Sequence, residues 1–256
     1  MLDKLPKIYG LMKMRNESAI LKDTLDNWSG ICTGGIFIYD DISEDNSVEI
    51  ARAHPAVKKV VEGEFWDPDR ERAEWFNRQM VLICAQQYAE EDAWFVYFDC
   101  DEHIYNFNQF DLFNNKHVKA IACRLYDFYI TPDDVDKNYK KREMIGPEFR
   151  TIIFFFKNSP SLRYSQPDQR IVTLPPNVGN IPIHGDIKHY GKGFSVDQWE
   201  KTCDYYIKFW PKYSDKWRKR KGKAIHEDVS DFGNKLIKWT DRDKGFSLED
   251  QVYGRN

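Results

Sequence analysis

The stretch that decides the fold is "AWFVYFDCDEH", residues 93–103, in which an apolar run ends in three carboxylates. The run has the composition of a strand that is buried on both faces, because nearly every position carries a large apolar side chain. A soluble protein rarely ends such a strand with this much negative charge unless a positive group meets it. We therefore expect Asp99 and Asp101 to face a cation.

The hundred residues before this point alternate between strand and helix patterns. Strand patterns lie at residues 7–14, 34–41, 57–64 and 93–98. Helix patterns separate them: one runs from Leu21 to Trp28 and ends at Gly30, with Asn16 or Ser18 as its cap, and a short one passes through Val48 and Ala51. This alternation predicts an α/β fold with a mostly parallel central sheet flanked by helices.

The third helix pattern, residues 67–91, is the clearest of the three. Asp67 is the expected N-cap, and Pro68 the first helical residue. Its apolar face is expected to comprise Ala73, Phe76, Met80, Ile83, Cys84 and Gln87.

Two pairs of acids follow different strands of this predicted sheet. Asp40 and Asp41 end the second strand, and Asp99 and Asp101 end the fourth. Because ligands of such sheets bind at the carboxyl ends of the strands, both pairs should lie on one edge. A solvated acidic turn is the alternative. The third helix carries three arginines, Arg70, Arg72 and Arg78. They are expected to bind phosphate or to pair with these acids, and the alternative is a charged, solvent-exposed helix face.

Composition limits the class of protein. The 256 residues carry a formal net charge of −3, which fits one large domain and gives no support to a general nucleic-acid binder. Five scattered cysteines without C-x-x-C spacing predict reduced thiols, and the chain shows neither an apolar leader nor a run of about 18 apolar residues. We expect a cytoplasmic protein, with peripheral membrane association left open.

The second half has fewer clear patterns. Strands are expected at residues 121–130 and 150–158, followed by turn-rich sequence to residue 185. Ser195 then caps a helix that Pro211 closes, which predicts a C-terminal helical extension. Residues 208–226 hold eight lysines or arginines. Three interpretations of this basic segment are open. It forms a solvated helix end, it contacts an anionic acceptor or a lipid headgroup, or its Arg218 or Arg220 binds a diphosphate.

Four segments resemble glycosyltransferase family 2 proteins, which have the GT-A fold. They are "MKMRNES", "IYDDISEDNSVEIARAHP", "YFDCDEH" with its D-x-D motif, and "IKHYGKGFSVDQWEKTCDYY". The resemblance covers roughly the first 105 residues and, more loosely, residues 188–206. It implies a single GT-A domain, with a nucleotide-sugar part in residues 1–105 and an acceptor-side part with C-terminal helices in residues 106–256.

The resemblance also implies roles for individual residues. Asp41 would accept a hydrogen bond from the base, and Asp99 and Asp101 would approach the ribose and a Mn²⁺ or Mg²⁺ ion. His189 would be a third metal or diphosphate contact. The remaining nucleotide-sugar contacts would be Met14, Arg15, Glu17, Arg72, Arg78 and Cys100. Arg15 stands where a tyrosine is frequent, and residues 43–45 replace Gly-Ser-Thr, so the nucleotide stays open, with a UDP-sugar favoured.

The implied reaction is metal-dependent transfer of a hexosyl group to the hydroxyl of a glycan or lipid-linked acceptor. An inverting outcome and a role in surface polysaccharide or glycan synthesis are expected. Such a reaction needs a general base, and Asp186 and Asp228 both remain candidates. The alternative functions are a sugar-phosphate nucleotidyltransferase, whose glycine-rich loop is missing after the first strand, and a nucleotide-sugar-binding protein without transferase activity. A phosphatase or receiver module fits the motif positions poorly.

Overall fold

The computed structural model describes residues 5–108, 110–164, 170, 172–176 and 178–249. The chain forms two compact units. Unit 1 comprises Met1–Cys123 and Ile152–Gly185, and unit 2 comprises Arg124–Thr151 and Asp186–Asn256. Residues 106–123 and 152–185 thus lie in the same unit as residues 1–105. The division of the chain into a nucleotide-sugar part and an acceptor-side part stays a prediction.

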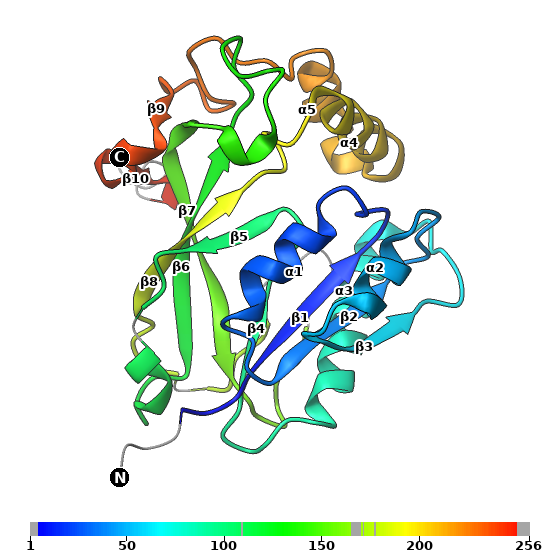
Figure 1. The fold of residues 1–256 in the computed structure, drawn as a ribbon, viewed down its shortest axis with the longest axis vertical. Coiled ribbons are helices and arrows are strands. Elements are labelled where there is room, and N and C mark those ends of the chain that lie inside the picture. Colours follow the sequence, from blue (N-terminus) through cyan, green and yellow to red (C-terminus); the bar gives the residue numbers. More distant parts are fainter. Residues whose placement is uncertain (1–4, 109, 165–169, 171, 177, 250–256) are drawn as a thin grey trace. The chain divides into compact units, whose positions relative to one another are not determined.

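Unit 1 is built on parallel strands (Figure 1). β1 pairs in parallel with both β2 and β4, β2 pairs in parallel with β3, and β4 pairs antiparallel with β7. The sheet path is β3-β2-β1-β4-β7-β6-β8-β5. The strands are β1 (Ile8–Met14), β2 (Gly35–Asp40), β3 (Val57–Glu62), β4 (Trp94–Tyr97), β5 (Glu102–Tyr105), β6 (Ala120–Phe128), β7 (Met144–Lys157) and β8 (Ile183–His189). The predicted α/β class with a mostly parallel sheet flanked by helices is confirmed.

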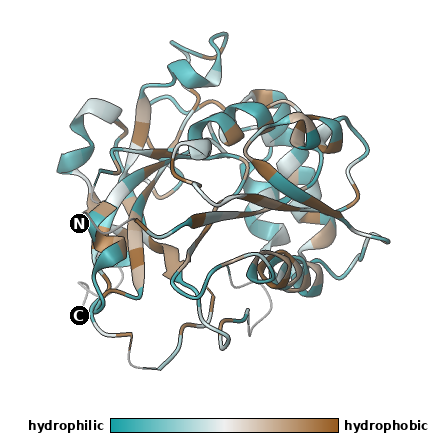
Figure 2. Ribbon diagram, turned by 60° about the horizontal axis from the view of Figure 1, so that its bottom comes forward, coloured by the Kyte–Doolittle hydropathy of each residue, from teal (hydrophilic) through white to brown (hydrophobic). Residues whose placement is uncertain are grey.

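Helices cover both faces of these strands. Because side chains alternate along a strand, Leu11, Phe37 and Phe95 share one face and pack with Val81 and Leu82 of α3 (Arg70–Gln86). On the other face the Trp28 ring of α1 (Leu21–Ser29) stacks on Phe98 at 4.4 Å between ring centroids. The shorter α2 (Ser47–Ala53) contacts β3 and α1. Figure 2 shows the apolar colouring concentrated on the strands.

Two predictions about helix starts are wrong. α1 begins after Ile20 without a side-chain cap, so neither Asn16 nor Ser18 is its N-cap. The Ser18 N–H donates to Asp45. α3 is capped by Asp69, which accepts a hydrogen bond from the backbone of Arg72. The predicted cap, Asp67, pairs with the Arg72 side chain instead.

The buried face of α3 also differs from the prediction. Phe76 and Ile83 are 43% and 41% exposed, whereas Arg70, Glu74 and Arg78 are buried. These three charged residues recur at four-residue spacing and turn toward the sheet. The charges that they neutralise there decide the orientation of the helix, and the hydrophobic pattern alone does not show them.

Unit 2 combines strand segments with the C-terminal helices. β9 (Ile237–Lys238) and β10 (Phe246–Ser247) both pair with β7, which begins at Met144, earlier than predicted. Ser195 caps α4 (Val196–Phe209) as predicted, and α5 (Ser214–Arg220) follows. Four 3-10 helices complete the described chain: η1 (Phe110–Asn114), η2 (Tyr139–Lys141), η3 (Pro211–Tyr213) and η4 (Trp239–Lys244).

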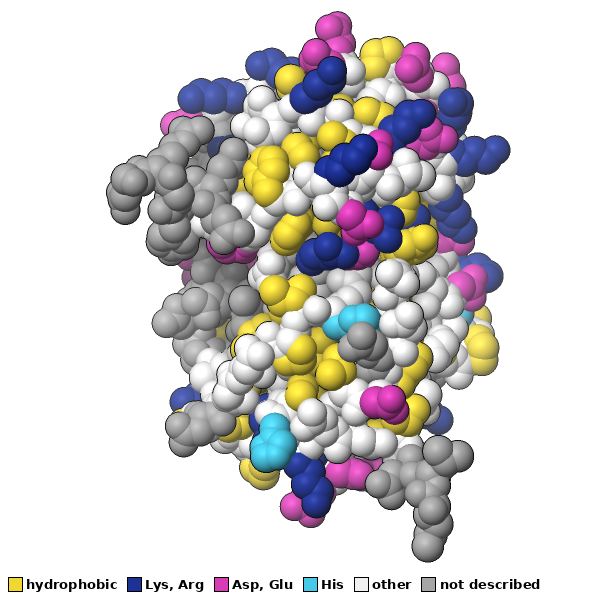
Figure 3. All heavy atoms as spheres, turned by 90° about the vertical axis from the view of Figure 1, so that its left-hand side faces the viewer, with side chains coloured by type: hydrophobic (Ala, Val, Ile, Leu, Met, Phe, Trp, Pro, Cys, Tyr) yellow, Lys and Arg dark blue, Asp and Glu magenta, His cyan; other side chains and the backbone are white. Residues whose placement is uncertain are grey.

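The surface mixes charges of both signs. On the face in Figure 3, lysine, arginine and acidic side chains are interspersed, in keeping with the small net charge. All five cysteines are buried and free. Within the described ranges, none of the helices combines the length and apolarity that crossing a membrane requires.

Candidate functional site

The acids after β2 and β4 lie at one edge of the sheet. In the parallel register Met14 lies beside Asp40, and Leu11 lies beside Tyr97. The segments that follow β1, β2 and β4 therefore leave the sheet at the same edge. The prediction that both acid pairs share this edge is confirmed.

Arg15 ties the loop after β1 to the loop after β2. Its Nη1 donates to the carbonyl oxygens of Asp41 and Ile42, both at 2.6 Å. The backbone N–H of Glu17 donates to Ser47 Oγ at 2.8 Å. Met14, at the end of β1, is buried. Arg15 therefore supports the backbone around Asp41.

Asp41 lies in a cationic environment with a flat ring nearby. It is 3% exposed and pairs through Oδ2 with Arg70. The guanidinium groups of Arg15 and Arg70 lie 5.3 Å and 5.1 Å from the centroid of Trp66. Trp66 was not predicted as a site residue, because its one signal in the sequence is an aromatic side chain just before the third helix.

Ion pairs and a cation–ring contact connect β1, α3 and β4. Glu74 pairs with Lys13 and, at 3.0 Å, with Arg78. Arg78 is 7% exposed, and its guanidinium lies 5.3 Å from the centroid of Tyr97. Its Nε and Nη1 make no hydrogen bond with any residue that the structure describes. Arg78 thus brings spare donors to the edge that bears Asp99.

Asp99 is an ionised carboxylate among cations. Burial would raise its pKa, but the charges of Arg170, Arg78 and Lys13 lower it below its usual range. Arg170 approaches its Oδ2 at 3.3 Å, and Tyr97 Oη donates to its Oδ1 at 3.1 Å. Arg170 was not predicted as a site residue, because it lies in the turn-rich stretch, where the sequence has no periodic pattern.

Glu17 is a buried acid near the carboxylates of this edge. Burial and the charges of Asp101, Asp99 and Asp45 raise its pKa to about 8, although Lys13 opposes them. Carboxylate oxygens are the ligands that Mg²⁺ and Mn²⁺ prefer. A local surplus of carboxylate charge therefore fits a divalent cation held by Asp99 and Asp101.

The segment that carries Asp99 and Asp101 is held in place by hydrogen bonds of its neighbouring residues. Trp28 Nε1 donates to the Glu102 carbonyl at 2.7 Å, and Thr24 Oγ1 donates to the Cys100 carbonyl. The Glu102 carboxylate accepts from the Asp99 N–H at 2.9 Å and pairs with Arg170. Cys100 is 2% exposed. Glu102 and Cys100 are thus framework residues that present the two acids.

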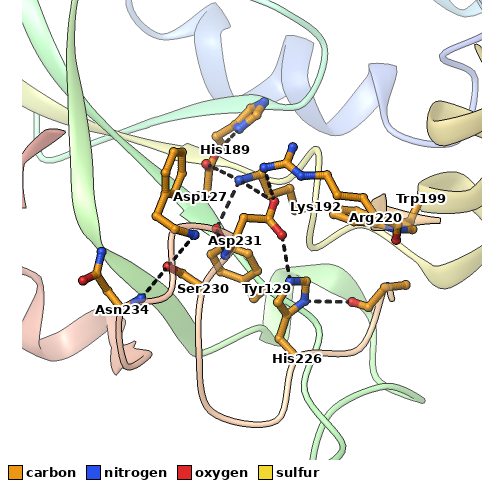
Figure 4. Close-up of polar contacts among 12 residues, drawn as sticks. Asp127, Tyr129, His189, Lys192, Trp199, Arg220, His226, Ser230, Asp231 and Asn234 are labelled. Atoms are coloured by element: carbon orange, nitrogen blue, oxygen red, sulfur yellow. Dashed lines mark hydrogen bonds and ion pairs between the residues drawn. The ribbon is translucent and has the colours of Figure 1, made fainter. Parts of the chain in front are cut away.

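Unit 2 holds a second charged cluster, shown in Figure 4. Asp127 pairs with Arg150 and Lys192, each at 2.8 Å, and accepts a hydrogen bond from His189 Nδ1. Burial would raise the pKa of Asp127, but Arg150, Lys192 and His189 hold it well below its usual range. The hydrogen bond fixes the orientation of the His189 ring.

Asp231 is the second acid of this cluster. Lys192 and Arg220 approach its Oδ2 at 3.1 Å and 2.8 Å, and His226 Nε2 lies 3.1 Å from its Oδ1. Burial opposes ionisation, but the hydrogen bond from His226 and the charges of Lys192 and Arg220 lower the pKa of Asp231 to about 2. Lys192 therefore bridges the two carboxylates.

The remaining predicted residues differ in their surroundings. Asp186 is 1% exposed, and its two oxygens are taken by Arg124 at 2.7 Å and Arg242 at 2.9 Å. Asp228 is exposed and forms no ion pair with the described residues. The Arg72 side chain is 63% exposed and pairs with Asp67. Arg72 therefore does not join the group around Asp99.

Comparisons with known proteins find distant similarity only. No protein-family model and no curated protein matches the chain. Residues 1–349 of S. aureus TarS match at 12% identity and a TM-score of 0.37, covering 82% of this chain and 69% of that one. Glucosyl-3-phosphoglycerate synthase from Mycobacterium tuberculosis, crystallised with Mn²⁺, UDP-glucose and phosphoglyceric acid, matches at 18% identity and a TM-score of 0.31, covering 49% and 44%.

The chain spans less than half of the first matched structures, namely 22% of TarS and 40% of TarS 1–349 in complex with UDP. The latter match has 15% identity and a TM-score of 0.35 and covers 54% of this chain.

Proposed function

We propose that the chain is a metal-dependent glycosyltransferase that moves a hexosyl group from a nucleotide sugar, with a UDP-sugar favoured, to an acceptor hydroxyl with inversion. The observation that carries the proposal is the meeting of Asp41, Asp99 and Asp101 at one sheet edge with the buried donors of Arg78. Acids suited to a cation and a guanidinium suited to phosphate are the groups that a nucleoside diphosphate requires.

The donor side is assigned to unit 1. Asp41 Oδ1 would accept from the base, and Trp66 offers a flat ring beside it. Asp99 and Asp101 would hold Mn²⁺ or Mg²⁺, with His189 as the third ligand that the family resemblance implies. The bound ion would stabilise the negative charge of the departing diphosphate. Arg78 would add hydrogen bonds to that group as its charge develops.

The general base is assigned to unit 2. It would take the proton of the acceptor hydroxyl as that oxygen attacks the sugar carbon. Asp228 is the better candidate, because its carboxylate is exposed and has no ion-pair partner among the described residues. Asp186 is buried between two arginines and would have to leave both of them to accept a proton.

The first test is nucleotide binding. Thermal melting with UDP, GDP, dTDP and CMP, each with and without Mn²⁺, should show a metal-dependent rise in Tm for one nucleotide. The Asp101→Asn variant should lose the metal-dependent part. Asp92→Asn is the matched control, because Asp92 is an exposed acid just before β4, at the opposite end of that strand. The absence of any metal-dependent shift, or an unchanged shift in Asp101→Asn, would contradict the proposal.

The second test is the product. A glycosyltransferase releases a nucleoside diphosphate, whereas a nucleotidyltransferase that consumes a nucleoside triphosphate releases pyrophosphate. Turnover of a nucleotide sugar to nucleoside diphosphate, lost in Asp101→Asn and retained in Asp92→Asn, is expected. Pyrophosphate release from a nucleoside triphosphate and sugar phosphate would assign the alternative function.

A further inference from the structure

Unit 2 carries more positive charge than its buried acids neutralise. Three cations, Arg150, Lys192 and Arg220, form ion pairs with the carboxylates of Asp127 and Asp231, and Lys216 lies on the same helix as Arg220. Four cations against two carboxylates leave two positive charges. Figure 4 shows the buried part of this group converging from β6, the segment after β8, α5 and the loop that follows it. The sequence indicated only a basic segment, with no sign that part of it is organised by acids.

Ion pairs fix the spacing of the cations. Arg150 pairs with Asp127, Asp127 with Lys192, Lys192 with Asp231, and Asp231 with Arg220. Lys192 is 9% exposed, donates hydrogen bonds to Asp127 Oδ2 at 2.8 Å and to Tyr129 Oη at 3.1 Å, and lies 3.1 Å from Asp231 Oδ2. Lys192 is therefore the hub of the network and not a ligand-binding group.

The other cations retain donors. Arg150 is bonded through Nη2, and its side chain is 38% exposed. The Arg220 side chain is 14% exposed and is bonded to Asp231 through Nη2. Arg150 and Arg220 therefore both have guanidinium hydrogens beyond those used in the network.

Lys216 completes the group. It lies four residues before Arg220 on α5, so both side chains share one helix face. Burial and then the charges of Arg220, Lys192 and Arg150 lower the pKa of Lys216, with Asp231 acting in the opposite direction. Lys216 therefore adds a further positive charge to the helix face that carries Arg220.

We propose that Arg150, Lys216 and Arg220 form a binding site for a phosphate group of the acceptor substrate. Two uncompensated positive charges match a phosphate dianion, and guanidinium groups suit its oxygens. The donor diphosphate has other cations in unit 1, since Arg78 and Arg170 lie at the edge that bears Asp99. The acceptor assignment rests on the proposed transferase function, whereas phosphate binding itself does not.

The experiment measures binding of inorganic phosphate and of UDP with Mn²⁺ to the same samples by calorimetry. Lys216→Gln is the test variant, because Lys216 forms no ion pair with the residues that the structure describes. Lys219→Gln, an exposed lysine on the same helix, is the matched control. We expect phosphate affinity to fall about tenfold in Lys216→Gln and to stay unchanged in Lys219→Gln. UDP affinity should be unchanged in both.

The outcomes separate the sources of the phosphate. Loss of phosphate binding with UDP affinity retained supports an acceptor site. A parallel loss of UDP affinity would assign the cluster to the donor diphosphate and overturn the acceptor assignment. Equal phosphate affinity in wild type and Lys216→Gln, or no phosphate binding at all, would overturn the site. Failure of UDP to bind any variant would count against the proposed function without affecting the phosphate result.

Discussion

Replacement of Asp231 by asparagine should destabilise the protein in a pH-dependent way. The carboxylate is buried, and its ion pairs with Lys192 and Arg220 and its contact with His226 lower its pKa to about 2. A carboxyl group whose pKa is lower in the folded than in the unfolded chain stabilises the fold above the unfolded pKa. That stability is lost as the pH falls through the folded pKa.

The magnitude follows from the shift. Lowering the pKa of Asp231 from the ordinary 3.8 to about 2 corresponds to about 2.4 kcal/mol, at 1.36 kcal/mol for each pH unit. The side chain is 7% exposed, so solvent screening removes little of this. The contribution is complete at neutral pH, and about half of it is lost by pH 3.

Urea unfolding at pH 7, 5, 4 and 3 measures the effect. The free-energy difference between wild type and Asp231→Asn should be constant from pH 7 to 5 and then shrink by about 1 kcal/mol by pH 3. Asp228→Asn is the control, because this exposed acid lies only three residues away; its effect should stay within about 0.5 kcal/mol. A difference for Asp231→Asn that does not change between pH 5 and pH 3 would refute the reasoning.

Three further predictions concern single residues. Trp28→Ala should cost about 3–5 kcal/mol in urea unfolding, because the ring is fully buried and stacked on Phe98; a loss below about 1 kcal/mol would contradict this packing. Asp186→Asn should cost about 3 kcal/mol, because two arginines lose their partner; unchanged stability with abolished turnover would instead identify Asp186 as the base. Arg78→Gln should weaken UDP binding about tenfold in calorimetry, and Arg72→Gln should leave it unchanged; the reverse order would remove Arg78 from the donor site.

Local patterns predicted much of unit 1. The buried runs that became β1, β2 and β4 are unambiguous, and parallel pairing brings the acids that follow them to one edge. Ser195 caps its helix because a hydroxyl at that position satisfies a backbone N–H three residues on. Both inferences need only sequence-local chemistry and the general rule for α/β sheets.

Other features depend on contacts distant in sequence. The orientation of α3 is set by Glu74 and Arg78 meeting Lys13 and Tyr97. Hydrophobic periodicity predicted a different face, because it assigns charged residues to solvent. Arg170 reaches Asp99 from a stretch without any regular pattern, so its role could not be read before the chain was folded.

By itself the sequence determined the strand–helix order of unit 1 and the edge that carries Asp41, Asp99 and Asp101, because those follow from side-chain periodicity and from where strands end. Only the tertiary structure decided which charges are paired. Asp186 became a partner of two arginines, and Lys192 became a bridge between two acids. Pairing depends on distances of a few ångströms between residues far apart in the chain, and no local pattern encodes those distances.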